Sequence, residues 1–322
     1  MKKTVRHLGL LFLQATLIVT AVGQTVQVDP KIPKYNKKEG VSGKISSIGS
    51  DTMNNLLALW GEAFKQIYPN VVIEFEGKGS STAPPALLAG TAQLGPMSRP
   101  MKAEEMEAIE RKYGFKPTAV NTAVDALAVY VHKDNPLESL TLQQLDAIFS
   151  KSRRGGYREN ITNWSQIDPN IGNRPISLYG RNSASGTYGF FKEHALFRGD
   201  FKDGVKEQPG SAAVVQGVSR DRYGIGYSGI GYRTSGVKAL AIAERAGARA
   251  YEPNFENAES GRYPIARVLF MYILKEPQKP LDPLLKEFLT YVLSFEGQSD
   301  VLKDGYYPLS YQSVMAERKK LD

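Results

Sequence analysis

Residues 181–191 read Arg-Asn-Ser-Ala-Ser-Gly-Thr-Tyr-Gly-Phe-Phe, and they follow a short apolar run at 176–179 that predicts a strand. The segment 189–196 predicts a helix, so small hydroxyl residues and a glycine precede a helix beside an arginine. Unpaired backbone N–H groups at a helix start attract anions, and arginine adds a fixed charge with a two-pronged donor geometry. The combination suits a small oxyanion, although Ser, Thr and Gly also cap helices without binding anything.

Two further segments repeat this order of strand, loop rich in Gly, Ser and Thr, and helix. Residues 48–53 (Ile-Gly-Ser-Asp-Thr-Met) stand before an amphipathic helix predicted at 54–68. Residues 76–82 (Glu-Gly-Lys-Gly-Ser-Ser-Thr) follow the β-rich run 71–75 and stand before a helix predicted at 83–90. Three such units in one chain favour an anion site over simple helix capping.

Composition and charge limit the class of protein. A length of 322 residues exceeds the usual size of a single core, so two domains are expected. The absence of cysteine excludes disulfides, zinc–thiolate sites, thiol chemistry and a lipid anchor on a cysteine after a signal sequence. The formal net charge of +8 favours anions, but no basic helix or aromatic–basic array accompanies it, so no nucleic-acid partner is expected.

The N-terminus predicts export. Residues 1–23 have a basic start, an apolar stretch and a small-residue cleavage site, which is the pattern of a signal peptide. An uncleaved membrane anchor is the alternative, but the apolar run is short and interrupted by polar residues. We expect cleavage, a location most simply in a periplasm, and a flexible leader at residues 24–43.

The order of elements predicts an α/β protein with two lobes. Strand and helix patterns alternate from residue 44 onward. Long β-prone runs at 119–132 and 265–274 flank a central block and predict two crossovers between lobes. Lobe I is then discontinuous, 44–126 plus 268–322, and lobe II is 127–267.

These residues resemble the phosphate-binding proteins of bacterial ABC-type phosphate uptake systems. The resemblance covers residues 44–309 and implies a type II-like periplasmic binding protein, in which each lobe is a mixed sheet flanked by helices and a two-strand hinge joins the lobes. The matching stretches are 49–52, 79–81, 95–101, 181–187 and 224–232.

The resemblance also implies a site for one dehydrated phosphate. Arg181 would supply charge, and hydroxyl and backbone N–H groups would supply hydrogen bonds. It implies no catalytic residue, no metal and no cofactor. The candidate phosphate-binding residues are Ser50, Asp51, Thr52, Ser80, Ser81, Ser98, Arg99, Arg181, Ser185, Gly186 and Thr187.

One position departs from the family pattern. Many members carry an aspartate where this chain has Ser98, and that carboxylate accepts the proton of phosphate, which fully ionised sulfate lacks. Asp51 and Asp125 are two candidates for a replacement acceptor. A helix-cap or turn role is the alternative for each, and is the one we expect for Asp125.

Two classes of function follow. The first is a monomeric receptor that captures phosphate and delivers it to a membrane ABC permease. The second is an exported phosphohydrolase or a sensor on the same fold, and sulfate or molybdate are alternative ligands. Hydrolysis needs an activated nucleophile or a metal, but Ser185 is not in a Gly-x-Ser-x-Gly motif, and His132 and His194 stand alone.

Overall fold

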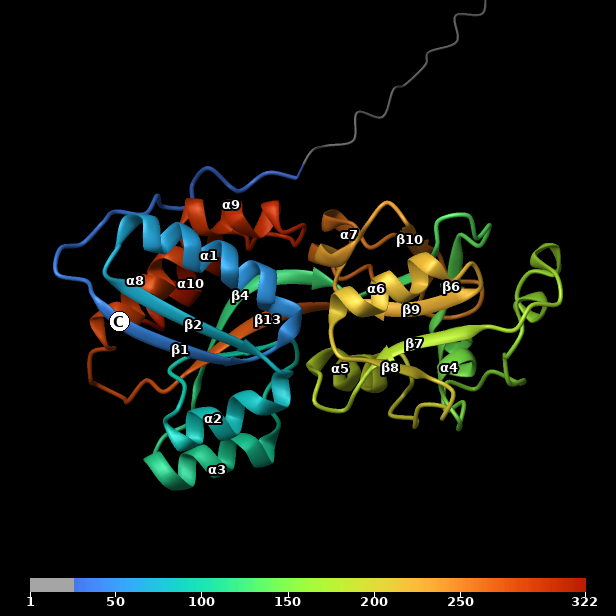
Figure 1. Ribbon diagram of the computed structural model, residues 1–322, viewed down its shortest axis with the longest axis horizontal. Helices are drawn as coiled ribbons and strands as arrows, with labels where there is room; N and C mark the ends of the chain where they lie inside the picture. The colour runs from blue at the N-terminus through green and yellow to red at the C-terminus, as the bar shows by residue number, and fades with distance from the viewer. Residues whose placement is uncertain (1–25) are drawn as a thin grey trace, which may run out of the picture.

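The computed structural model describes residues 26–322, and the predicted signal peptide at 1–23 lies outside them. Figure 1 shows two bodies side by side with β4 and β13 running between them. We call residues 44–126 with 268–322 lobe I and residues 127–267 lobe II, the limits that the sequence predicts. Within residues 26–322, no helix has both the length and the apolar character needed to cross a membrane.

Lobe I is built on two sheets with helices around them (Figure 1). Its strands are β1 (Gly43–Gly49), β2 (Val71–Gly77), β3 (Gly95–Met97), β4 (Thr118–Ala126) and β13 (Ala266–Ile273). Its helices are α1 (Asn54–Ile67), α2 (Ala83–Ala89), α3 (Ala103–Tyr113), α8 (Pro283–Val292), α9 (Phe295–Lys303) and α10 (Tyr311–Lys319). β1 pairs with β2 in parallel, and β13 lies between β3 and β4, antiparallel to both.

Lobe II contains a mixed sheet in the order β10-β5-β9-β7-β8 and a small sheet in the order β12-β11-β6. The strands are β5 (Ala128–His132), β6 (Ser139–Thr141), β7 (Ser177–Arg181), β8 (Lys206–Gln208), β9 (Gly224–Ser228), β10 (Val237–Ala239), β11 (Ala241–Ala243) and β12 (Ala250–Tyr251). The helices are α4 (Leu142–Phe149), α5 (Gly186–His194), α6 (Ser211–Arg220) and α7 (Phe255–Glu259), with short turns η3 (Trp164–Gln166), η4 (Pro169–Ile171) and η5 (Ile230–Tyr232).

Aromatic packing holds the helices that carry the site. In lobe I the ring of Phe64 on α1 meets Phe288 on α8 edge-on, with centroids 5.3 Å apart. In lobe II the ring of Phe191 on α5 stacks on Tyr227 of β9 with centroids 4.0 Å apart. Both pairs are fully buried, so α1 and α5 are fixed to their lobes by large apolar contacts.

The two crossings between the lobes lie next to each other. The predicted β-run at 119–132 is divided at Leu127 into β4 and β5, which belong to different sheets. β13 returns beside β4 in antiparallel register, with Arg267 opposite Asp125 and Ala266 opposite Ala126. This pair of strands corresponds to the two-strand hinge.

Several helices differ from the prediction. α5 begins at Gly186 rather than at residue 189, because the Ser185 hydroxyl caps the earlier start. The pattern of residues 281–296 predicts one helix, but this segment is broken into α8 and α9, and Ser294 caps the second of them. α6 was not predicted, although its buried Val214, Val215 and Val218 have helical spacing.

The N-terminal segment differs from the flexible leader that the sequence predicts. Val28 and Ile32 are buried against lobe I. The hydroxyl of Tyr35 lies 2.7 Å from that of Tyr68 and donates to Glu287 at 2.9 Å. Apolar burial and these hydrogen bonds therefore fix part of the leader to the fold.

Candidate functional site

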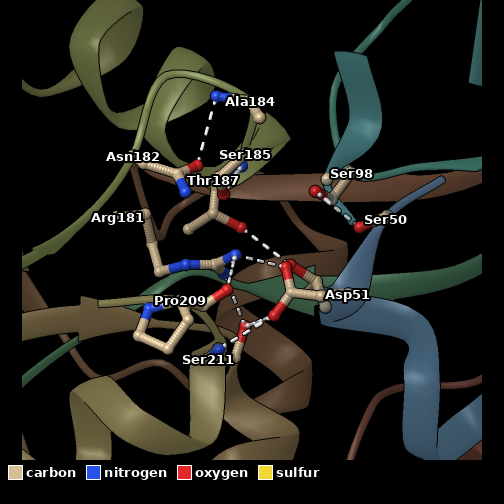
Figure 2. A network of polar contacts seen from close by, with 12 residues as sticks. Ser50, Asp51, Ser98, Arg181, Asn182, Ala184, Ser185, Thr187, Pro209 and Ser211 are labelled. Carbon is tan, nitrogen blue, oxygen red and sulfur yellow. Dashed lines mark hydrogen bonds and ion pairs between the residues drawn. The ribbon is translucent and has the colours of Figure 1, made fainter. Parts of the chain in front are cut away.

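The candidate site lies where loops from both lobes meet, and Figure 2 shows its polar contacts. From lobe I come η1 (Asp51–Met53) after β1, η2 (Ser80–Thr82) after β2 and the loop after β3. From lobe II come the end of β7 and the first turn of α5. Six hydroxyl side chains of these segments are at most 1% exposed: Ser50, Thr52, Ser80, Ser98, Ser185 and Thr187. Such burial of polar groups requires hydrogen-bond partners.

Arg181 is the charged centre of the site. It ends β7 and is 2% exposed. Its Nη1 donates to the Ser211 hydroxyl at 3.0 Å, and its Nη2 donates to Asp51 Oδ1 at 2.5 Å and to the Pro209 carbonyl at 3.4 Å (Figure 2). Its buried Nε has no partner among the described residues. This N–H is therefore a donor available to an anion.

Asp51 comes from lobe I, but the partners of its carboxylate lie in lobe II. Besides Arg181, it accepts the backbone N–H of Ser211 at 2.9 Å and the Ser211 hydroxyl at 3.3 Å. Its own carbonyl accepts from the hydroxyl of Tyr232 at 2.9 Å. Asp51 therefore acts as counter-ion to Arg181 and ties the first loop to lobe II, and both carboxylate oxygens are engaged.

Three serines of lobe I form one buried cluster. Ser50 donates to Ser98 Oγ at 3.0 Å, and the Ser98 backbone N–H donates to Ser80 Oγ at 3.0 Å. The hydroxyls of Ser80 and Ser98 are 3.3 Å apart. Because each hydroxyl has one proton and two lone pairs, these groups can reorient to donate to an anion.

The first turn of α5 lies directly against this cluster. A Cβ placed on Gly186 would lie 2.2 Å from Ser80 Oγ and 2.6 Å from Ser98 Oγ, so only glycine fits there while the lobes are this close. The Ser185 hydroxyl accepts from the backbone N–H groups of Thr187 and Tyr188 at 3.1 and 3.3 Å. Gly186, at the first helical position, has an N–H that the helix itself does not use.

The hydroxyl of Thr187 is a junction between the lobes. It lies 2.9 Å from the hydroxyl of Thr52, and it accepts from Nη2 of Arg267 at 2.9 Å. Sequence reasoning missed Arg267, as it missed Ser211. One feature of the sequence could have indicated Arg267, since it is the single basic residue within the apolar run at 265–274.

Arg99 and Ser81 are engaged with other groups. The Arg99 guanidinium donates to the two carboxylate oxygens of Glu105 at 2.8 and 2.7 Å, and to Ser81 Oγ at 3.2 Å. Burial alone would raise the pKa of Glu105, but the hydrogen bonds and charge of Arg99 and the N–H of Lys102 hold it below its usual value. The charge of Arg99 is thus neutralised beside the site.

Asp125 has a larger role than the cap or turn that we expected. It is fully buried in β4, and its Oδ2 accepts from Arg267 Nε at 2.9 Å. Its Oδ1 accepts the backbone N–H of Ile230, the first residue of η5. Asp125 therefore caps this short helix from a distant position in the sequence. The carboxylate is a structural counter-ion at the hinge, so it is not a free acceptor.

Histidines and carboxylates do not assemble into a metal site within residues 26–322, where no group of three or more is placed to hold an ion. The ring of His194 lies against Phe190 with centroids 4.1 Å apart, and burial lowers its pKa.

Comparisons with known proteins identify the family of the chain. A model of the PBP superfamily domain matches residues 36–296. The phosphate-binding protein PstS of Pseudomonas aeruginosa PAO1 is 55% identical over 293 residues, which are 90% of this chain and 91% of that protein. Protein SphX of Synechococcus elongatus is 30% identical over 280 residues, 86% of this chain and 80% of its own length.

A solved structure gives the same result for the fold. A protein of Clostridium perfringens, described as a phosphate ABC transporter substrate-binding protein with bound phosphate, superposes with a TM-score of 0.71. It is 28% identical, and the match covers 83% of this chain and 100% of that one. The resemblance and the fold class predicted from the sequence are confirmed: the chain belongs to the PBP superfamily, in the family of the PstS phosphate-binding proteins.

Proposed function

We propose that this protein is an exported receptor that captures inorganic phosphate between its lobes and delivers it to a membrane ABC permease. The observation that carries the proposal is the buried Nε of Arg181, which has no partner within residues 26–322, in a site that also holds buried hydroxyl side chains of both lobes. The relatives support it, because they are named as phosphate-binding proteins. We accordingly propose a binding protein rather than an enzyme, acting as a monomer in the periplasm.

The contacts that we propose for phosphate are of three kinds. Arg181 Nε gives a charge-assisted hydrogen bond, and the N–H of Gly186 gives one from a helix start. The other donors are hydroxyl groups of Ser50, Ser80, Ser98, Ser185 and Thr187. Hydrogen bonds from fixed groups then replace the water shell of the ion. Asp51 already balances the charge of Arg181, so binding depends mainly on oriented dipoles.

Capture requires that the lobes approach each other. The N–H of Ser81 in lobe I donates to the carbonyl of Ala184 in lobe II at 3.0 Å, and Asp51 pairs with Arg181 across the same gap. A bound ion would add contacts to both sides. Phosphate therefore favours the closed arrangement, and opening about β4 and β13 would release it.

Ser98 supports a second possibility, a broader oxyanion receptor. The family resemblance implies a carboxylate at this position in many members, and a hydroxyl can either donate to an anion or accept from a protonated one. Asp51 and Asp125 are both held in ion pairs, so neither replaces that carboxylate. We expect sulfate to be rejected less strongly than a buried carboxylate would reject it.

Calorimetric titration of the dialysed protein, residues 24–322, with phosphate, sulfate, molybdate and arsenate tests the proposal. We expect one phosphate per chain and a loss of about 2–5 kcal/mol in binding free energy for Arg181→Met, which removes the donor and leaves Asp51 unpaired. Arg220→Met, at an exposed position on α6, is the matched control. Tight binding of sulfate or molybdate instead of phosphate would establish the second possibility, and no binding of any oxyanion would refute both.

A further inference from the structure

Arg267 is a second buried arginine beside the site, and it has no assigned role. It lies on β13 where the chain crosses between the lobes, and its side chain is 2% exposed. Its Nε donates to Asp125, its Nη1 to the carbonyl of Ser98, and its Nη2 to the hydroxyl of Thr187, each at 2.9 Å. Its guanidinium carbon also lies 5.3 Å from the ring centre of Phe190.

These contacts join three parts of the molecule. Asp125 belongs to the neighbouring hinge strand β4, Ser98 to a site loop of lobe I, and Thr187 with Phe190 to the first turns of α5 in lobe II. One rigid guanidinium therefore spans the hinge and both halves of the candidate site. All of these bonds can exist together only while the lobes are close.

The bond to Thr187 also determines what its hydroxyl can do. A threonine hydroxyl has one proton and two lone pairs, and Arg267 occupies one lone pair. The hydroxyl oxygens of Thr52 and Thr187 are 2.9 Å apart. If Thr52 donates to the second lone pair of Thr187, the proton of Thr187 must point to another acceptor. An anion held between Arg181 and Gly186 would be that acceptor, and the two incoming hydrogen bonds strengthen the donation.

We propose that Arg267 is a positioning residue for anion capture, which acts through Thr187 by directing its hydroxyl proton toward the ion. The inference rests on the proposed function, because it takes the anion to be bound against the first turn of α5. Thr52 then supports Thr187 and does not contact the ion itself. Because Asp125 neutralises Arg267, the arginine orients the hydroxyl of Thr187 and adds little net charge to the site.

A double-mutant cycle on phosphate affinity tests the inference. We expect Arg267→Gln and Thr187→Val each to weaken phosphate binding roughly tenfold to a hundredfold, the range for one hydrogen bond from a charged or polarised group. Because both changes remove the same bond to the ion, the double variant should be within about threefold of Thr187→Val alone. Arg262→Gln, which removes an exposed arginine shortly before β13, is the matched control.

A variant that keeps the buried charge distinguishes loss of the bond to Thr187 from misfolding. Arg267→Lys retains a cation opposite Asp125, but one ammonium cannot reproduce the three-way geometry of the guanidinium. We expect it to keep the thermal unfolding midpoint close to the wild-type value and still lose affinity, and the cycle with Thr187→Val can be repeated on it. Multiplicative losses in both cycles, or wild-type affinity in Arg267→Lys, would overturn the inference. Failure of the wild-type protein to bind phosphate would instead refute the proposed function.

Discussion

Gly186 gives a direct test of how the lobes close on the site. Alanine at this position would place a Cβ 2.2 Å from Ser80 Oγ, where an ordinary contact begins at 3.4 Å. The first turn of α5 and the serine cluster would have to separate by about 1 Å, and overpacking of this size typically costs about 1–3 kcal/mol. That cost corresponds to a roughly 5- to 150-fold loss of phosphate affinity.

The same change should leave the fold intact. Ser80 and Ser98 belong to lobe I and Gly186 to lobe II, so opening of the lobes relieves the overlap. Alanine is also a better helix former than glycine, so the free energy of unfolding without phosphate should stay level or rise. Calorimetric titration gives the affinity, and urea unfolding gives the stability.

Gly189→Ala, one turn further along α5, is the matched control. A Cβ there meets Arg99 Cδ at 3.4 Å, which is an ordinary contact, and it lies away from the serine cluster. We expect affinity close to wild type for this variant. If Gly186→Ala also binds phosphate as tightly as the wild type, the ion is not held where these two lobes meet.

Two further predictions concern selectivity and pH. Ser98→Asp should raise the ratio of phosphate to sulfate affinity, because a buried carboxylate accepts the phosphate proton and repels sulfate; an unchanged ratio in competition titrations would count against this. Burial raises the pKa of Asp304 to about 7, and its Oδ2 has no partner among the described residues. Because the folded protein then holds a proton that the unfolded chain releases near pH 4, Asp304 should lower stability progressively as pH rises from about 4 to 7. Asp304→Asn should therefore stabilise the protein more at pH 8 than at pH 4 in urea unfolding, and an equal effect at both would contradict the assignment.

Local elements of the fold were predictable because their signals lie within a few residues. The apolar spacing at 54–68 predicts a helix, and α1 runs from Asn54–Ile67. The early start of α5 depends on one side chain, since the Ser185 hydroxyl takes two N–H groups of the first turn. Ser294 likewise caps the start of α9 within residues 281–296, which the sequence predicts as one helix. Both errors arise because an apolar pattern does not reveal a capping side chain.

The site was predicted less completely, because its decisive contacts join residues far apart in the sequence. The Asp51–Arg181 bond spans 130 positions and the Arg267–Thr187 bond spans 80. No local pattern indicates which groups meet when the lobes close. Arg99 is a different case, because its partner Glu105 is only six residues away and could have been considered as its counter-ion.

The proposed function places an oxyanion between the lobes, beside Arg181 and Gly186. Crystals grown with arsenate, located by the anomalous scattering of arsenic, test this most directly. We predict one arsenic site per chain, within hydrogen-bond reach of Arg181 Nε and of the hydroxyl groups of Ser80 and Thr187. An arsenic site elsewhere on the molecule, with Arg181 Nε facing no anion, would contradict it.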